Sequence, residues 1–159
     1  MRRKKILQVI ERFDVAGAET VVRDLVVNLP ASEWETEVCV LQNIGRLGAE
    51  LKAQGYPIHH LNWKYDTQSQ TRIIGKLHAL IKARQIDLLH SHSTAAWYFA
   101  SLARIPMTIG HCVTLHGFNW GKAHWKMSLM CAVLSRLTDT IVIVSDGIRE
   151  YLKTIPLLR

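Results

Sequence analysis

The sequence predicts an α/β fold, with a Rossmann-like parallel sheet of about six strands and helices on both faces. Two observations support it. Six short, mostly apolar segments alternate with segments whose apolar residues have helical spacing. Most links between them are short, and a strict β/α alternation joined by right-handed crossovers gives a parallel sheet that helices cover on both sides.

The alternation begins near the first residue. Ile6–Ile10 is a short apolar run ended by charge, and Val21–Leu29 has helical spacing up to a proline. Thr36–Leu41 is β-branched and alternating, which is typical of a strand. Leu47–Ala53 predicts a short helix stopped by a glycine, and Pro57–Leu61 predicts a third strand.

The second half repeats this order. The apolar stripe Ile73–Ile81 predicts the clearest helix, because two basic residues in its last turn complement the helix dipole. The remaining expected elements are the strand Asp87–His90, the helix Ala95–Ala103, the strand Thr108–Leu115, the helix Lys126–Leu137, the strand Thr140–Val144 and the helix Gly147–Lys153.

Length and composition limit the classes of function. The 159 residues fit one domain, and 48% hydrophobic with 21% charged residues exclude a disordered chain. The net charge of +7 is concentrated between residues 51 and 137, a segment that contains ten Lys and Arg but only two acidic residues. This basic middle suits phosphorylated ligands, anionic lipid or nucleic acid. Nucleic acid is disfavoured, because the basic residues are dispersed and no recognition-helix or zinc pattern occurs.

The cysteines and the apolar runs indicate the compartment. Three cysteines without a CxxC spacing indicate neither a disulfide framework nor a zinc knuckle, so a reducing compartment is the simpler reading. The apolar run at the start is too short for a secretory signal, and none reaches the roughly 20 residues that span a bilayer. We therefore expect a cytoplasmic protein, and contact with the inner face of a membrane is compatible with it.

Ligands of a doubly wound sheet bind beyond the carboxyl ends of its strands, so the strand-to-helix loops are the places to inspect. In the first loop, the small residues Ala16, Gly17 and Ala18 precede Glu19 at the start of a helix. Their backbone amides could approach a diphosphate, favoured by the helix dipole. A tight turn at Gly17 with Glu19 complementing the dipole is the structural alternative. Neither dinucleotide nor P-loop fingerprints occur, which disfavours an NAD or ATP enzyme.

Histidines end the fourth and fifth expected strands. His90 and His92 are two residues apart, so they project to the same side of the sheet, and His116 ends the next strand in the same layer. Histidine near neutral pH can act as an acid, a base or a hydrogen-bond donor. No third ligand with suitable spacing is evident, so no metal is expected. Packed, hydrogen-bonded strand-end histidines are the structural alternative, more so for His90 than for His92.

The loop before the fifth expected helix mixes aromatic and basic residues. Trp120, Lys122, Trp125 and Lys126 have a composition that suits a membrane interface, with the rings at headgroup depth and the ammonium groups on anionic lipid. The same composition could stack on single-stranded nucleic acid. Burial of one tryptophan in the core is the third alternative.

Taken together, five segments in register resemble the amino-terminal domain of family 4 glycosyltransferases, which have the GT-B fold. These segments are Ile6 to Glu19, Gly45 to Leu51, Asp87 to His92, Val113 to Gly117 and Asp139 to Ser145. The resemblance implies that residues 1–159 form an acceptor-side, Rossmann-like domain, one half of a GT-B fold. The donor-binding, carboxyl-terminal domain is absent from it, and the chain alone is expected to be inactive.

The resemblance also implies a reaction and a site. A hexosyl group would pass, with retention, from a nucleotide-sugar to a polysaccharide or lipid-linked acceptor, with the nucleotide-sugar as substrate and no cofactor or essential metal. His116 would lie near the transferred sugar and Ala16–Glu19 near the donor diphosphate. Ser91, His92 and Asn119 would lie on the acceptor side. A domain completed by a second domain of the same chain or by a partner subunit is expected. The alternative is a non-catalytic module that holds a partner transferase at the membrane surface.

Overall fold

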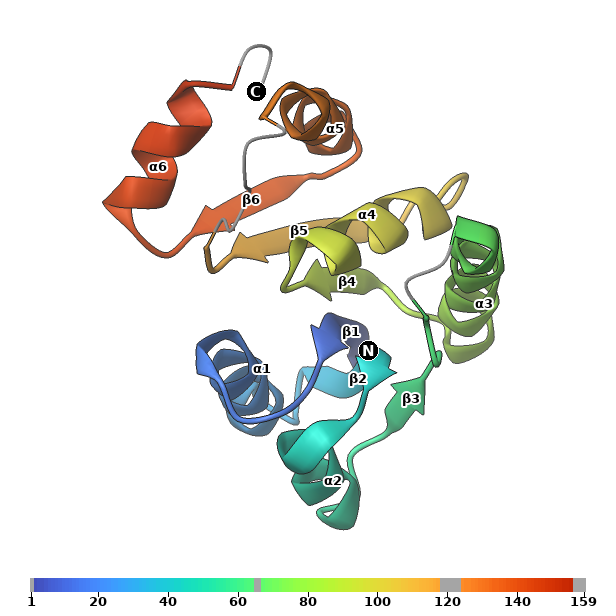
Figure 1. Ribbon diagram of the computed structural model, residues 1–159. Coiled ribbons are helices and arrows are strands. Elements are labelled where there is room, and N and C mark those ends of the chain that lie inside the picture. Colours follow the sequence, from blue (N-terminus) through green and yellow to red (C-terminus); the bar gives the residue numbers. More distant parts are fainter. Residues whose placement is uncertain (1, 65–66, 118–123, 156–159) are drawn as a thin grey trace.

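A computed structural model describes residues 2–64, 67–117 and 124–155 of the chain. Within them, six parallel strands alternate with six helices (Figure 1). The strands are β1 (Lys4–Arg12), β2 (Trp34–Asn43), β3 (Ile58–His60), β4 (Leu88–Ser91), β5 (Gly110–Leu115) and β6 (Thr140–Ile143). The helices are α1 (Gly17–Asn28), α2 (Gly45–Ala53), α3 (Thr67–Arg84), α4 (Thr94–Ala103), α5 (His124–Arg136) and α6 (Asp146–Lys153). This architecture confirms the predicted fold class.

The sheet has the strand order β3-β2-β1-β4-β5-β6. The chain therefore winds outward from β1 to one edge, returns past β1 to β4, and winds outward to the other edge. The reversal between β1 and β4 is a topological switch point, and in such sheets it is where ligands bind, outside the carboxyl ends of the strands. β1 and β4 are paired neighbours in the sheet, and Gln8 of β1 lies opposite His90 of β4.

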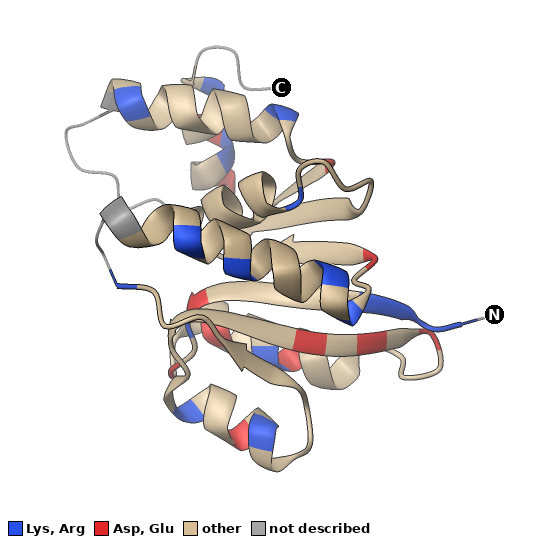
Figure 2. Ribbon diagram, turned by 90° about the vertical axis from the view of Figure 1, so that its right-hand side faces the viewer, with Lys and Arg blue, Asp and Glu red and all other residues tan. Residues whose placement is uncertain are grey.

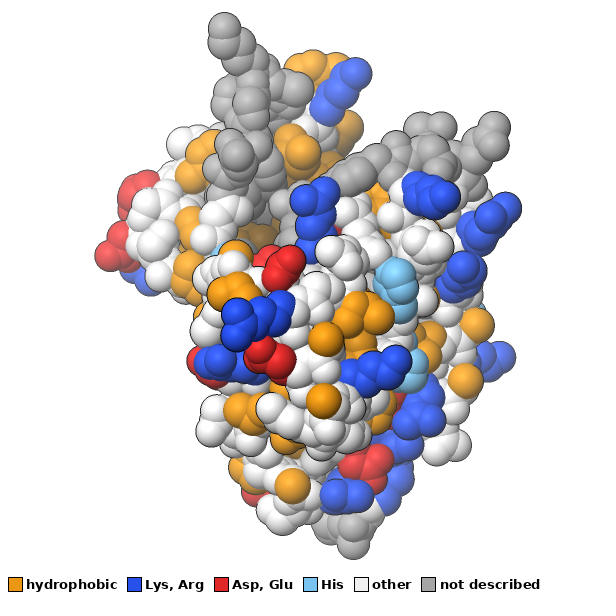
Figure 3. All heavy atoms as spheres, turned by 60° about the horizontal axis from the view of Figure 1, so that its bottom comes forward, with side chains coloured by type: hydrophobic (Ala, Val, Ile, Leu, Met, Phe, Trp, Pro, Cys, Tyr) orange, Lys and Arg blue, Asp and Glu red, His pale blue; other side chains and the backbone are white. Residues whose placement is uncertain are grey.

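Helices cover the two faces unequally (Figure 1). On one face, Val22 and Val26 of α1 and Leu47 and Leu51 of α2 pack on apolar residues of β1 and β2. On the other face, α3 and α4 cover the centre of the sheet, while α5 and α6 pack on the β5 and β6 side. Figure 3 shows the side that carries α1 and α2, where basic, acidic and hydrophobic side chains are interspersed.

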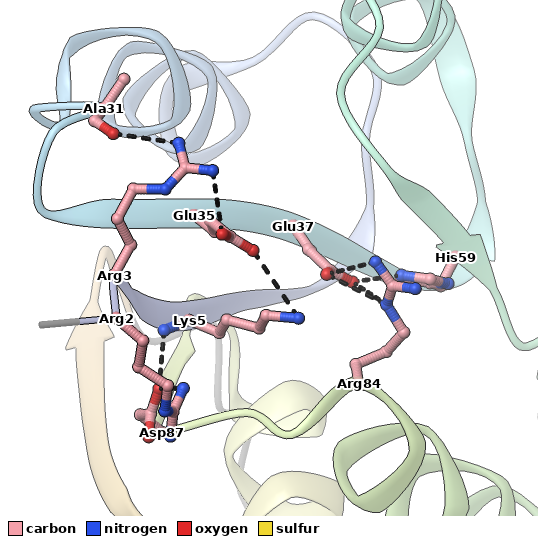
Figure 4. A network of polar contacts seen from close by, with 9 residues as sticks. All are labelled: Arg2, Arg3, Lys5, Ala31, Glu35, Glu37, His59, Arg84 and Asp87. Carbon is pink, nitrogen blue, oxygen red and sulfur yellow. Dashed lines mark hydrogen bonds and ion pairs between the residues drawn. The ribbon is translucent and has the colours of Figure 1, made fainter.

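Ion pairs lie along the amino-terminal parts of the strands (Figure 4). Glu37 of β2 is almost fully buried, and its carboxylate accepts hydrogen bonds from Nε and Nη2 of Arg84 at 2.8 to 3.0 Å. Nε2 of His59 in β3 lies 2.7 Å from the same carboxylate. The side chain of Asp87, just before β4, pairs with Arg2 and accepts the backbone N–H of Lys5. These contacts tie α3, β3 and β4 to the central strands.

Basic residues are prominent on α3 and the amino-terminal strand (Figure 2). Arg72, Lys76 and Lys82 are exposed along α3, within the basic segment between residues 51 and 137.

No described helix is long and apolar enough to cross a membrane.

Candidate functional site

A cleft of about 720 Å³ opens at the carboxyl ends of β4 and β5. It lies beside β1, next to the switch point of the sheet, which is where the topology places a ligand site. Its lining combines strand ends, the first turn of α4 and one residue of α5: Glu11, His92, Ser93, Thr94, Ala95, Thr114, Leu115, His116, Gly117 and Met127.

His92 and His116 meet in this cleft. Nδ1 of His92 lies 3.3 Å from Nε2 of His116, and the ring centroids are 5.6 Å apart. The other ring nitrogen of His92, Nε2, lies 2.7 Å from Oε1 of Gln8 in β1. His92 is buried at 2% exposure, whereas His116 is partly exposed. His116 is therefore the member of the pair that can face a ligand.

His90 lies against His92 but is held differently. Its ring centroid lies 4.0 Å from that of His92, as expected for residues two apart on one strand face. Its Nε2 lies 2.8 Å from the hydroxyl of Thr114. His90 is absent from the cleft lining, which agrees with its interpretation as a packed, hydrogen-bonded residue.

Burial keeps the three histidines neutral. Burial, with the nearby His116 and His111, lowers the pKa of His90 from 6.5 to about 4. Burial, followed by the charges of His90 and His116, lowers the pKa of His92 well below 6.5. Burial also lowers the pKa of His116, while the charge of Glu19 opposes this shift. At neutral pH the pair can therefore donate and accept hydrogen bonds without carrying charge.

Glu19, in the first turn of α1, is close enough to His116 for its negative charge to favour a higher pKa of this histidine. Ala16 occupies the N-cap position of α1 and provides no side-chain hydrogen bond to the first turn. Ser93 and Ser145 do cap α4 and α6, at 3.1 Å and 3.4 Å. The first turn of α1 thus lacks the side-chain cap that the other two helices have. A Cβ added at Gly17 would meet no atom within 4 Å.

The other predicted site residues lie elsewhere. Ser91 is fully buried and does not line the cleft, and its hydroxyl lies 3.0 Å from Nε2 of His111. Asn119, Trp120 and Lys122 lie outside the described residues.

At the start of α5, Trp125 is 69% exposed, and Nζ of Lys126 lies 5.5 Å from its ring centroid. Leu129 and Val133, one and two turns farther along the same helix face, are also exposed. The core alternative weighed for this loop therefore does not apply to Trp125.

Sequence analysis did not single out several residues of the site, Glu11, Thr114 and Gln8 among them. Glu11 lines the cleft from the carboxyl end of β1, and Thr114 lines it from β5. Gln8 is fully buried beside His92. Its signal in the sequence is a polar residue in the middle of an apolar strand. Among the described residues, no group of three His, Cys, Asp or Glu is placed to hold a metal ion.

Comparisons with solved structures show what the fold is similar to. HepE of Anabaena, in complex with UDP and glucose, superposes with a TM-score of 0.72 at 14% identity, over 97% of this chain and 42% of that chain. A glycosyltransferase from Rickettsia africae has a TM-score of 0.71 at 19% identity, over 97% and 40%. The lipopolysaccharide outer core galactosyltransferase WaaB has a TM-score of 0.69 at 13% identity, over 96% and 42%.

The chain thus spans about two fifths of the length of these structures, and at such identities they establish the fold alone. No curated protein matches the sequence. The family described as Glycosyltransferase Family 4 matches residues 15–157, almost the whole chain. The sheet order, the family match and the superposition on one half of GT-B structures agree, and this chain belongs to glycosyltransferase family 4.

Proposed function

We propose that residues 1–159 are the acceptor-side, amino-terminal domain of a retaining hexosyltransferase that is completed by a donor-binding domain, on the same chain or on a partner. The donor is a nucleotide-sugar, the acceptor a polysaccharide or lipid-linked sugar, and no cofactor or essential metal takes part. The observation that carries the proposal is the meeting of His92 and His116 in the cleft at the switch point. The UDP and glucose bound by the similar HepE structure support the class of donor.

His116 is the proposed catalytic residue. Its lowered pKa leaves it neutral near pH 7, so that it can hydrogen-bond a sugar hydroxyl and stabilise charge that develops at the transferred sugar. His92 supports it from the acceptor side. The leaving diphosphate would be stabilised mainly by the second domain, so the chain alone is expected to be inactive.

The test is transfer by the chain joined to its donor-binding domain. His116→Ala is expected to lower kcat by about 100-fold or more, within the range for a positioned acid–base or electrostatic group. His60→Ala is the control, because His60 is an exposed histidine outside the cleft. A rate for His116→Ala within twofold of the control would overturn the catalytic role. A completed protein that binds a transferase partner but transfers nothing would favour the non-catalytic module instead.

The first loop, Ala16 to Glu19, is the proposed binding site for the donor diphosphate. The first turn of α1 has no side-chain cap, so its amides are available to an anion at the positive end of the helix dipole. Gly17→Ala adds a Cβ to open space and should not disturb the fold, but it should hinder close approach of a diphosphate.

We expect Gly17→Ala to weaken binding of a nucleoside diphosphate to the completed protein by about tenfold, equivalent to about 1.4 kcal/mol. Gly75→Ala is the matched control, since a Cβ there also meets no atom within 4 Å and the residue lies in α3. Equal affinities for the two variants would contradict the proposed loop.

A cytoplasmic domain with peripheral contact to the membrane is the third part of the proposal. Trp125, Leu129 and Val133 form an exposed apolar face on α5, with Lys126 beside it, a pattern that suits insertion at an anionic bilayer surface.

Cosedimentation with vesicles containing anionic lipid tests the membrane contact. Trp125→Ser should reduce binding several-fold, whereas Val27→Ser, at an exposed valine of α1, should not. Equal binding of the wild type and Trp125→Ser would contradict it.

A further inference from the structure

A buried glutamine stands behind the pair of histidines in the cleft. Gln8 lies in the middle of β1 at 0% exposure, within a strand whose other central residues are apolar. Its Oε1 lies 2.7 Å from Nε2 of His92, which belongs to the segment 84 residues farther along the chain. A fully buried amide is expensive unless it is hydrogen-bonded, and Nε2 of Gln8 has no hydrogen-bond partner among the described residues, so a role for this residue has to be sought in the partner of its Oε1.

The contacts define a chain of donors and acceptors. The Oε1 atom of Gln8 can only accept, so Nε2 of His92 carries a proton and donates to it. Because burial keeps His92 neutral, its Nδ1 is then unprotonated and can only accept. Nε2 of His116, 3.3 Å away, therefore carries a proton and donates to His92.

The same rule fixes the last nitrogen. A neutral imidazole has one N–H, so His116 protonated at Nε2 has an unprotonated Nδ1. His116 is the partly exposed member of the chain and lines the cleft. We propose that Gln8 is a positioning residue, which acts through His92 to hold His116 in the tautomer whose Nδ1 accepts a hydrogen bond from a ligand hydroxyl. The role of His116 toward a sugar rests on the proposed function, whereas the tautomer does not.

Substitution of Gln8 should change the tautomer only where the acceptor for Nε2 of His92 is lost. Gln8→Leu removes this acceptor and should leave His92 and His116 as mixtures of both tautomers.

The experiment is ¹⁵N NMR of the imidazole rings in the chain as it stands, near neutral pH, where protonated and unprotonated ring nitrogens have well-separated shifts. We expect His92 and His116 both protonated at Nε2 in the wild type. In Gln8→Leu, the signals of His116 should change from those of the tautomer protonated at Nε2 to those of a mixture of both tautomers. Gln42→Leu is the control, because this glutamine of β2 bonds Arg12 rather than a histidine of the cleft.

A wild-type spectrum with His92 or His116 protonated at Nδ1 would overturn the proposal, even if the Gln8→Leu variant does not fold. It would also be overturned by a folded Gln8→Leu variant whose His116 spectrum equals that of the wild type. The transfer assay separates this inference from the proposed function. A normal rate in His116→Ala with the expected tautomers would refute the function and leave the positioning role of Gln8 intact.

Discussion

Arg84→Met removes the guanidinium that faces the buried carboxylate of Glu37, and we expect it to lower the free energy of unfolding by about 3 kcal/mol. Removing one partner of a buried ion pair costs about 3–5 kcal/mol, because the remaining charge is left without compensation. The Glu37 side chain is only 3% exposed, so this penalty applies. The Arg84 side chain is 43% exposed and His59 keeps its contact at 2.7 Å, which places the expected value at the lower end of the range.

Urea unfolding near neutral pH measures this free energy. Adding Glu37→Gln to Arg84→Met removes the uncompensated charge and should recover about 1–2 kcal/mol. Arg46→Met is the control, because Arg46 and Glu50 form an exposed ion pair, for which we expect less than about 0.5 kcal/mol. A loss for Arg84→Met no larger than that of the control would refute the reasoning.

The same pair predicts a dependence on pH. Burial alone would raise the pKa of Glu37, but the hydrogen bonds and charges of Arg84 and His59 lower it below 4.5. A carboxyl group with a lowered pKa stabilises the fold above its unfolded value of 4.5, and this stabilisation is lost as the pH falls through the folded value. The difference in stability between the wild type and Arg84→Met should therefore shrink in acid.

Three further predictions concern the core. Burial, the largest cause, lowers the pKa of His90 and His111 from 6.5 to about 4, so NMR titration should find both neutral down to about that pH, and stability should fall between the two values because the unfolded chain binds the protons first; midpoints near 6.5 would contradict this. Burial raises the pKa of Cys39 to about 12, so a thiol reagent should label the half-buried Cys112 first in the native protein, and equal rates would argue against it. Leu7→Ala, at a fully buried site in β1, should cost about 3 kcal/mol in urea unfolding, and a loss below about 1 kcal/mol would be inconsistent with this packing.

The order of the elements was predictable because each strand and helix buries an apolar side, and burial produces periodicity in the sequence. The ends were less predictable. β1 extends from Lys4 to Arg12 and α3 begins at Thr67, in both cases beyond the apolar runs. Backbone pairing in β1 continues through exposed residues such as Lys4, which is opposite Trp34. The pattern of hydrophobic residues does not indicate this pairing, because it reports only which side chains are buried.

Part of the site followed from strand geometry alone. Alternation along β4 places His90 and His92 on one side, and the same alternation directs Ser91 to the opposite face, where it is buried. The neighbouring positions of β4 and β5 bring His116 to His92. Gln8 could not be selected in this way, because its contact with His92 depends on which strand lies beside β4, and that order is a property of the whole sheet.

The described ion pairs around Glu37 and Asp87 gather at the amino-terminal parts of the strands, whereas the cleft with His116 opens at the carboxyl ends. The two groups of residues lie at opposite ends of the strands, and distant substitutions tend to be additive in their effects on stability. One end of the sheet can therefore accumulate changes in ligand preference while the other maintains the folded state. A fold divided in this way is a good starting point for diversification, in nature or by directed evolution.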